Sequence, residues 1–184
     1  MTHESLPAHQ ESSLPESVHP ESALPEPART ESVRLESVRG RDSRALLAEL
    51  LDRHAEFWGE RDLRHAHAWP WFHQFGGWGL VALDQDGIVG YLLGVVTADG
   101  LGYVQLIAVL PEYRRQGLAA SLWRAFARQA GAAGATRLEA ITGPPNTASI
   151  AFHTGLGMTA ELVPDYAGPG EDRVLFRAHV SAIA

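Results

Sequence analysis

The stretch from Tyr103 to Ala119, with the sequence YVQLIAVLPEYRRQGLA, constrains the fold of this chain more than any other. Its first half is an almost continuous apolar run, which is typical of a strand covered on both faces of a sheet. Pro111 ends the run because proline cannot donate a hydrogen bond to a sheet ladder. The residues from Arg114 onward then predict the start of a helix. The stretch therefore predicts a buried strand that leads through a short connection into a helix.

The connection also has the chemistry of an anion site. Free main-chain N–H groups and the positive end of a helix dipole attract phosphate groups. Gly117 lacks a side chain, so a phosphate can approach its backbone closely, and Arg114 and Arg115 add positive charge. A strand, a turn and a helix with two surface arginines would explain the same residues without a ligand, since a single short motif is only a hypothesis.

Two segments together resemble the GNAT superfamily of N-acetyltransferases. Arg114, Gly117 and Ala119 match that family's acyl-CoA-binding pattern, Gln/Arg-x-x-Gly-x-Gly/Ala. Residues 146–158, NTASIAFHTGLGM, resemble the second element of the family, a helix that begins at an asparagine. The resemblance covers residues 30–180, which is nearly the whole chain apart from its N-terminal tail.

The resemblance implies an α/β (α+β) fold, with a mixed and mostly antiparallel sheet of about seven strands flanked by about four helices. The implied order of elements is β-α-α-β-β-β-α-β-α-β-β. Periodicity alone predicts only a mixed α/β domain with one sheet. The expected strands are residues 32–38, 78–83, 88–97, 103–110, 136–142, 159–164 and 173–180. The expected helices are residues 43–58, the first part of 60–69, the segment from 118 to 131, and 147–155.

The length of 184 residues fits one domain preceded by a tail. Residues 1–29 contain a repeat of Glu, Ser and Pro, as in Glu11-Ser-Ser-Leu-Pro15. Recurrent proline prevents helices and sheet ladders, so this tail is expected to be disordered or to dock as an extended strap. Residues 30–184 are expected to form the GNAT domain. The chain has no cysteine, which excludes disulfides and thiolate chemistry.

The formal net charge is −7, and arginine supplies every formal positive charge among the side chains. An acidic chain argues against a nucleic-acid partner and favours a cationic or neutral substrate. No apolar run approaches the roughly 20 residues of a membrane span, and the N-terminus lacks the basic and apolar regions of a signal peptide. We therefore expect a cytoplasmic protein without a membrane partner, and a homodimer remains open.

The resemblance implies acetyl-CoA as the cosubstrate. Main-chain amides of the connection would hold its pyrophosphate, and the central strand would offer main-chain groups to its pantetheine arm. Asn146 stands where the family's asparagine contacts the cofactor, although it would cap a helix equally well without one. The expected cofactor-binding residues are Ile107, Ala108, Val109, Arg114, Arg115, Gln116, Gly117, Leu118, Ala119, Asn146, Ser149 and Phe152.

The resemblance also implies catalytic residues. His153 stands where many members have a tyrosine that protonates the leaving thiolate, and histidine can donate a proton near neutral pH. His153 as a packing residue is the alternative. Several members carry a glutamate on the central strand as the base, whereas this strand has Tyr103 and Gln105. Tyr103 and Glu139, the nearest acid on the next strand, are the expected candidates, and a water chain or His65, His67 or His73 are alternatives.

The acceptor is expected to contact His67, Trp71 and Tyr166. Aromatic residues around Trp71 would form a wall for a cation or a flat ring, unless they belong to the core. His65 and His67 share a face only in a strand. Because no third ligand stands at a suitable spacing, we expect no metal.

The function expected from these residues is transfer of an acetyl group from acetyl-CoA to a primary amine of a small molecule, by direct attack on the thioester. Acetylation of a protein or peptide amine is one alternative. A non-catalytic acyl-CoA-binding module is another, because the central strand lacks the carboxylate that would serve as the base.

Overall fold

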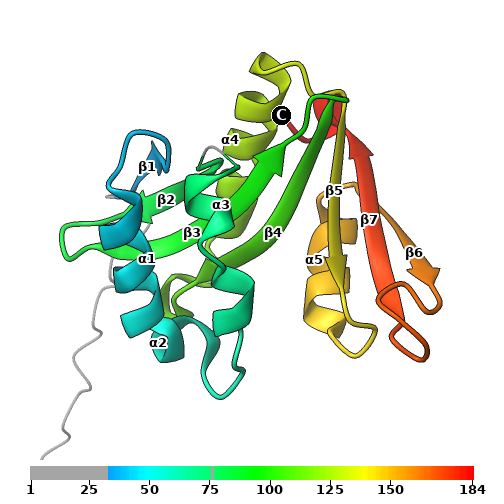
Figure 1. Ribbon diagram of the computed structural model, residues 1–184, viewed down its shortest axis with the longest axis horizontal. Helices are drawn as coiled ribbons and strands as arrows, with labels where there is room; N and C mark the ends of the chain where they lie inside the picture. The colour runs from blue at the N-terminus through cyan, green and yellow to red at the C-terminus, as the bar shows by residue number, and fades with distance from the viewer. Residues whose placement is uncertain (1–32, 76) are drawn as a thin grey trace, which may run out of the picture.

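The chain folds around one seven-stranded sheet with helices on both faces (Figure 1). The computed structural model describes residues 33–75 and 77–184, so the predicted tail of residues 1–29 lies outside the described residues. The strand order is β1-β2-β3-β4-β5-β7-β6, in which β4 and β5 run parallel and the other neighbours run antiparallel. The strands are β1 (Arg34–Ser37), β2 (Gly79–Leu83), β3 (Ile88–Val96), β4 (Leu101–Val109), β5 (Arg137–Thr142), β6 (Thr159–Val163) and β7 (Arg173–His179). This confirms the mixed, mostly antiparallel sheet.

Helices cover the two faces of the sheet in two groups. In Figure 1, α1, α2 and α3 lie over one face of β2, β3 and β4, and α4 lies behind the same strands. His153 of α5 contacts both Trp123 of α4 and Phe176 of β7, which places α4 and α5 on the same face. The helices are α1 (Ser43–Asp52), α2 (His54–Trp58), α3 (Pro70–His73), α4 (Leu118–Ala132), α5 (Thr147–Gly155) and α6 (Val180–Ile183), and the short 3-10 segments are η2 (Arg64–His67) and η3 (Pro111–Tyr113).

Helix α4 packs closely on the sheet because two strands offer glycines to it. A Cβ atom on Gly94 would stand 2.9 Å from the Phe126 ring, and one on Gly102 would stand 3.2 Å from the Cβ atom of Ala130. Trp123 and Phe126 are fully buried there. The sheet and α4 thus form the rigid base from which β4 continues into the functional site.

The first helical region differs in detail from its prediction. The helix expected over residues 43–58 is broken at Arg53, whose side chain donates to the Ile88 carbonyl and pairs with Glu56. Helical periodicity continues across this break, so the sequence gives no sign of it. Pro70, expected to follow the end of a helix, instead begins α3, a position where its fixed φ fits and its missing N–H is not needed.

The C-terminal end differs as well. The last strand was expected to reach Val180, but β7 ends at His179, whose ring nitrogen accepts from the amide of Ser181 and caps α6. The described residues contain six α-helices rather than about four. The additional ones have four or five residues, too few for a helical period to show.

No helix in residues 33–75 or 77–184 combines the length and the apolar character that a bilayer crossing requires.

Candidate active site

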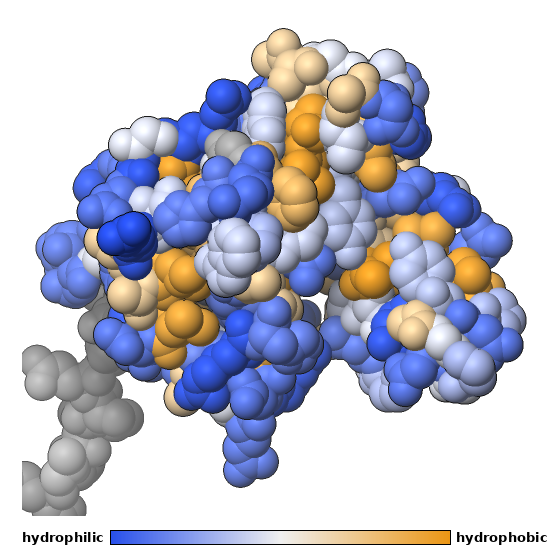
Figure 2. Space-filling view, viewed as in Figure 1, coloured by the Kyte–Doolittle hydropathy of each residue, from blue (hydrophilic) through white to orange (hydrophobic). Residues whose placement is uncertain are grey.

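The central feature of the site is the separation of β4 from β5. The two strands pair in register only from Leu101 opposite Arg137 to Val104 opposite Ala140, and beyond that point they diverge. Gln105 is an extra residue in β4, because Val104 lies opposite Gly94 and Leu106 lies opposite Leu93 of β3. Such a bulge bends a strand locally. Between the diverging strands lies a cleft of about 590 Å³, and Figure 2 shows the hollow.

The connection from β4 to α4 presents unpaired main-chain amides beside this cleft. Within the described residues, the amides of residues 115–120 donate no hydrogen bond, and the start of α4 has no side-chain cap. The first amide of the segment that is engaged, Ser121, donates to the Gly117 carbonyl. Arg115 and Gly117 both have positive φ, 62° and 82°. A Cβ atom on Gly117 would meet nothing within 4 Å, so space outside this loop is open. This arrangement favours an anion.

The Arg114 side chain holds this loop in place. Its Nε donates to the Val109 carbonyl and its Nη2 to the Phe57 carbonyl, each at 2.9 Å. The guanidinium therefore ties the loop to the end of β4 and to α2. It also places a cation beside the carbonyl groups at the C-terminal end of α2, which is favourable. Arg114 is therefore engaged with main-chain carbonyls and sets the position of the loop.

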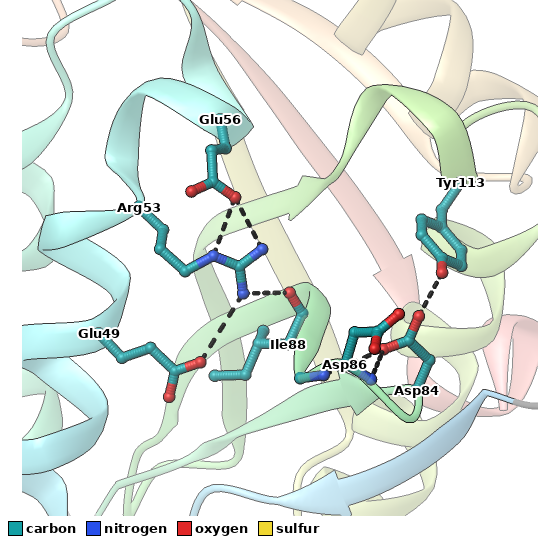
Figure 3. A network of polar contacts seen from close by, with 8 residues as sticks. Glu49, Arg53, Glu56, Asp84, Asp86, Ile88 and Tyr113 are labelled. Atoms are coloured by element: carbon teal, nitrogen blue, oxygen red, sulfur yellow. Dashed lines mark hydrogen bonds and ion pairs between the residues drawn. The ribbon is translucent and has the colours of Figure 1, made fainter.

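A second anchor comes from the β2–β3 hairpin (Figure 3). The buried Asp84 carboxylate accepts from the amides of Asp86 and Gly87 and from the Tyr113 hydroxyl. Burial opposes ionisation of Asp84, but these hydrogen bonds outweigh it and lower the pKa of the carboxyl. Tyr113 is the last residue of η3, directly before the loop. The hairpin therefore fixes one end of the loop.

Asn146 is committed to capping α5. Its Oδ1 accepts from the Ser149 amide at 3.2 Å, and its Nδ2 donates to Thr142 Oγ1 at 3.0 Å. Asn146, Ser149 and Phe152 all line the cleft. The cap thus ties the start of α5 to the end of β5 on the cleft wall.

His153 lies deep against the core rather than at the surface. Its Nδ1 is 2.8 Å from the Ser149 carbonyl oxygen, which can only accept, so Nδ1 carries the hydrogen. Its ring stacks on Phe176 with 4.2 Å between centroids. The Nε2 atom is buried without a partner in the described structure, although the residue lines the cleft. Burial lowers the pKa of His153, and the hydrogen bond to Ser149 opposes that shift.

Tyr103, Glu139 and Tyr166 are close enough to interact electrostatically. Burial raises the pKa of Tyr103 to about 12, and the charges of Tyr166 and Glu139 add to the rise. Tyr103 lies opposite Glu139 in the sheet, and Glu139 is bound by Arg177 at 3.3 Å. Tyr103 and Glu139 belong to the paired part of β4 and β5, Tyr166 follows β6, and none of the three lines the cleft.

His67 occupies a different environment from the one expected of an acceptor-binding residue. Its Nδ1 donates to the Leu63 carbonyl at 2.8 Å, and its Nε2 accepts from the Tyr91 hydroxyl at 2.7 Å. That hydroxyl accepts in turn from Trp58 Nε1. Burial lowers the pKa of His67. With both nitrogens engaged and 2% of the residue exposed, His67 supports Trp58, which lines the cleft, from behind.

The expected aromatic wall lies away from the cleft. Trp71 stacks on Tyr103 with 6.2 Å between ring centroids and contacts Phe75, and neither tryptophan ring of residues 69 and 71 lines the cleft. Phe72 is buried in the core. Among the described residues, no group of three histidine or acidic side chains is placed to hold a metal ion.

The structure brings together most of the expected cofactor-binding residues and adds others. The expected residues that line the cleft are Ile107, Ala108, Val109, Arg114, Ala119, Asn146, Ser149, Phe152 and His153. Arg115, Gln116 and Gly117 form the exposed loop beside it, and the Leu118 side chain enters the core. Sequence reasoning missed Asp84, Trp58, Arg61 and Arg173. In the sequence, the hairpin turn at residues 84–87 already accounts for Asp84. The other three residues belong to no motif.

A family model matches the part of the chain that builds most of this site. The family model described as the acetyltransferase (GNAT) family matches residues 43–158, which include β4, the loop and α5. No curated protein sequence matches the chain.

Solved structures resemble the fold at low sequence identity. Ard1 from Thermoplasma volcanium superposes with a TM-score of 0.65 at 14% identity, covering 80% of this chain and 97% of that one. A GNAT-family protein from Desulfovibrio desulfuricans superposes with a TM-score of 0.63 at 19% identity, covering 80% of this chain and 99% of that one. A Bacillus subtilis acetyltransferase in complex with CoA superposes with a TM-score of 0.58 at 16% identity, covering 80% of this chain and 98% of that one.

Proposed function

Because the chain belongs to the GNAT family of acetyltransferases, we propose that it transfers an acetyl group from acetyl-CoA to the primary amine of a small molecule. The observation that supports this most strongly is the run of unpaired amides at residues 115–120 beside the cleft between β4 and β5. A helix N-terminus with free N–H groups is suited to a diphosphate, and a diverging strand offers main-chain groups to an amide-bearing arm.

The residues present fit acetyl-CoA. The loop amides would hold the diphosphate, and the unpaired edge of β4 along residues 105–109 would hold the pantetheine arm toward the bulge at Gln105. Phe152 and Ala119 give that arm apolar walls. Bound in this way, the cosubstrate supplies an acetyl group activated as a thioester.

The reaction needs a neutral amine at the thioester carbonyl. The amine nitrogen forms a bond to the carbonyl carbon, the carbon–sulfur bond breaks, and its electron pair goes to sulfur as the CoA thiolate. The amine loses one proton, and the thiolate gains one, so the sum is an amide and CoA. Holding both partners in one cleft removes the entropy cost of a bimolecular encounter.

We propose that Glu139, which directly precedes Ala140 of the cleft lining, serves as the base through a water molecule, and that Tyr103 does not. With its pKa raised to about 12, the Tyr103 phenol keeps its proton near neutral pH, whereas a carboxylate can accept one. Glu139→Gln should lower kcat by about 100-fold, within the range for loss of a general base. Glu161→Gln is the matched control, because Glu161 pairs with the same Arg177 from the edge strand β6. Equal effects of the two changes would contradict the assignment.

His153 as the proton donor for the thiolate stays a prediction with a definite requirement. Its Nδ1 hydrogen is committed to Ser149, so donation from Nε2 requires the doubly protonated ring. Since burial lowers the pKa of His153, that form is populated only in acid. The role therefore requires kcat to rise as the pH falls from 8 to about 6, because the protonated fraction of His153 keeps growing until the pH reaches its lowered pKa. A flat profile between pH 8 and about pH 6 would exclude it.

The proposed function is tested by measuring CoA release from acetyl-CoA over a panel of small primary amines and short peptides, together with calorimetric binding of acetyl-CoA. We expect binding and release that depends on a small amine. Release with peptides alone would favour protein acetylation, and binding without release on any amine would indicate a CoA-binding module. Absence of acetyl-CoA binding would contradict the proposal itself.

A further inference from the structure

The charged side chains that line the cleft are arginines, in a protein whose net charge is −7. Arg61, Arg114 and Arg173 line it, and among the described residues no aspartate or glutamate does. Net charge alone favoured a cationic or neutral acceptor. An acceptor responds to the potential inside the cleft, however, and the cleft walls carry positive charge.

One of the three arginines is already engaged by the protein. Arg114 donates to the carbonyls of Val109 and Phe57, as described above. Arg61 and Arg173 therefore remain as the cations that can meet a ligand, and they come from opposite walls. Arg61 follows α2, and Arg173 begins β7. In Figure 1, α2 and the start of β7 lie on the two sides of the gap between β4 and β5, and hydrophilic residues flank the hollow in Figure 2.

Arg61 is solvent-exposed and makes no ion pair in the described part of the chain. The neighbouring Asp62 pairs with Arg64 instead. The Arg61 guanidinium lies over the Trp58 ring, with Cζ 5.7 Å from the centroid. Stacking on an aromatic ring orients a guanidinium and leaves its N–H groups free at the edges. Arg61 is thus a positioned cation without an anion.

Arg173 has a partner that a ligand can displace. Both of its Nη atoms are 3.1 Å from one Glu171 oxygen, and its Nη1 also donates to the Asp172 carbonyl. The Glu171 side chain is 60% exposed, and exposed ion pairs contribute little net stability. A carboxylate in the cleft would compete with Glu171 for the same guanidinium.

From these observations we propose that the acceptor is a small primary amine that also carries a carboxylate, such as an amino acid. This inference rests on the proposed function. The carboxylate lies between Arg61 and Arg173 on the side of the sheet opposite α4 and α5, and the amine points between the diverging strands toward the thioester. Arginine suits this role because its planar guanidinium matches a carboxylate with two parallel hydrogen bonds.

The test compares acceptors that differ only in the carboxylate. CoA release is measured with amino acids, each paired with its carboxamide and with the amine that lacks the group. We expect kcat/KM to be at least about tenfold higher for the carboxylate form of the preferred scaffold, as expected for a charge-assisted hydrogen bond. Arg61→Gln and Arg173→Gln should each raise KM for that form by about tenfold. The KM for the carboxamide and the KM for acetyl-CoA should both stay unchanged. Arg61→Lys should restore part of the loss.

Arg128→Gln is the matched control, since Arg128 is exposed on α4 away from the cleft and makes no ion pair among the described residues. Equal or faster turnover of the uncharged partners would overturn the inference, and so would bound acetyl-CoA without release on any carboxylate-bearing amine. A rise in the KM for acetyl-CoA in Arg61→Gln would overturn it too, because Arg61 would then serve the cofactor. Failure to bind acetyl-CoA would instead contradict the proposed function.

Discussion

The two sides of the cleft present different chemical groups. On the side of α4 and α5, the groups offered to a ligand are main-chain amides of residues 115–120, held by Arg114 and Asp84 from behind. On the opposite side they are side chains: Trp58 ends α2, Arg61 follows α2, and Arg173 begins β7. A main-chain site depends on backbone conformation and tolerates many side chains. A side-chain site can change its ligand with one substitution, so the first side suits a constant cosubstrate and the second a variable acceptor.

We expect the largest effect from a substitution that disturbs only the main-chain amides of residues 115–120. Gly117→Ala places a Cβ on a residue with φ 82° at the point where the amides face open space. An L-residue in this conformation costs about 1–2 kcal/mol, and relief of that strain would turn the amides away. We expect acetyl-CoA to bind about 30-fold more weakly, equivalent to 2 kcal/mol, with the KM of the acceptor unchanged. Calorimetry and steady-state kinetics measure the two quantities.

Gly134→Ala is the control for this change. Gly134 has φ 92° and equally open surroundings, but it lies beyond the other end of α4. The free energy of unfolding, measured in urea, should fall by about 1–2 kcal/mol in both variants. Only Gly117→Ala should bind the cofactor more weakly. Equal losses of affinity would show that the loop amides do not hold acetyl-CoA.

An intermediate effect should follow from loosening the loop without touching it. Asp84→Asn weakens the contact that fixes Tyr113 before the loop, and a buried group left unsatisfied costs about 1–3 kcal/mol of stability. We expect the KM for acetyl-CoA to rise about fivefold, or 1 kcal/mol, with little change in kcat. Asp99→Asn, in the β3–β4 hairpin, is the control, because the Asp99 side chain is 68% exposed and pairs with Arg137. An unchanged KM for acetyl-CoA in Asp84→Asn would show that the hairpin does not hold the loop in its binding position.

The last effect concerns stability rather than binding, and it involves buried histidines. Burial lowers the pKa of His54, His67 and His153 in the folded protein. Below the usual pKa of about 6.5 the unfolded chain then binds more protons than the folded one. The free energy of unfolding should therefore fall as the pH drops from about 6.5, by at most about 1.4 kcal/mol per pH unit for each histidine.

Urea unfolding at pH 7.5 and 5.5 measures this dependence. His153→Phe should reduce it, and the exposed His73→Gln should leave it unchanged. Stability that is constant or rises in acid would contradict the burial of these rings as neutral groups.

The difference between the two sides also explains what could be predicted from the sequence. Pro111 and Gly117 encode the loop locally, and Asn146 and Gly155 bound α5 as expected. The contact of Asp84 with Tyr113 spans 29 residues and depends on the folded hairpin. Arg61 and Arg173 meet at one cleft only because β4 and β5 diverge, which no local pattern shows.

His67 illustrates the same limit. In the sequence it stands in a polar, histidine-rich connection, which suggested contact with an acceptor. Its burial is set by Tyr91, 24 residues away on β3, and by the turn of η2 that brings the Leu63 carbonyl to its ring. Composition of a segment predicts its exposure only when its partners are local.

Amide NMR of the full chain with two ligands shows whether the loop amides bind the diphosphate. Acetyl-CoA carries the diphosphate, and acetylpantetheine shares the thioester arm without it. If the loop amides hold the diphosphate, acetyl-CoA shifts the amide resonances of residues 115–120, whereas acetylpantetheine binds far more weakly and leaves these resonances in place. Shifts of equal size with both ligands, or none in this segment with acetyl-CoA, would contradict this role of the loop amides.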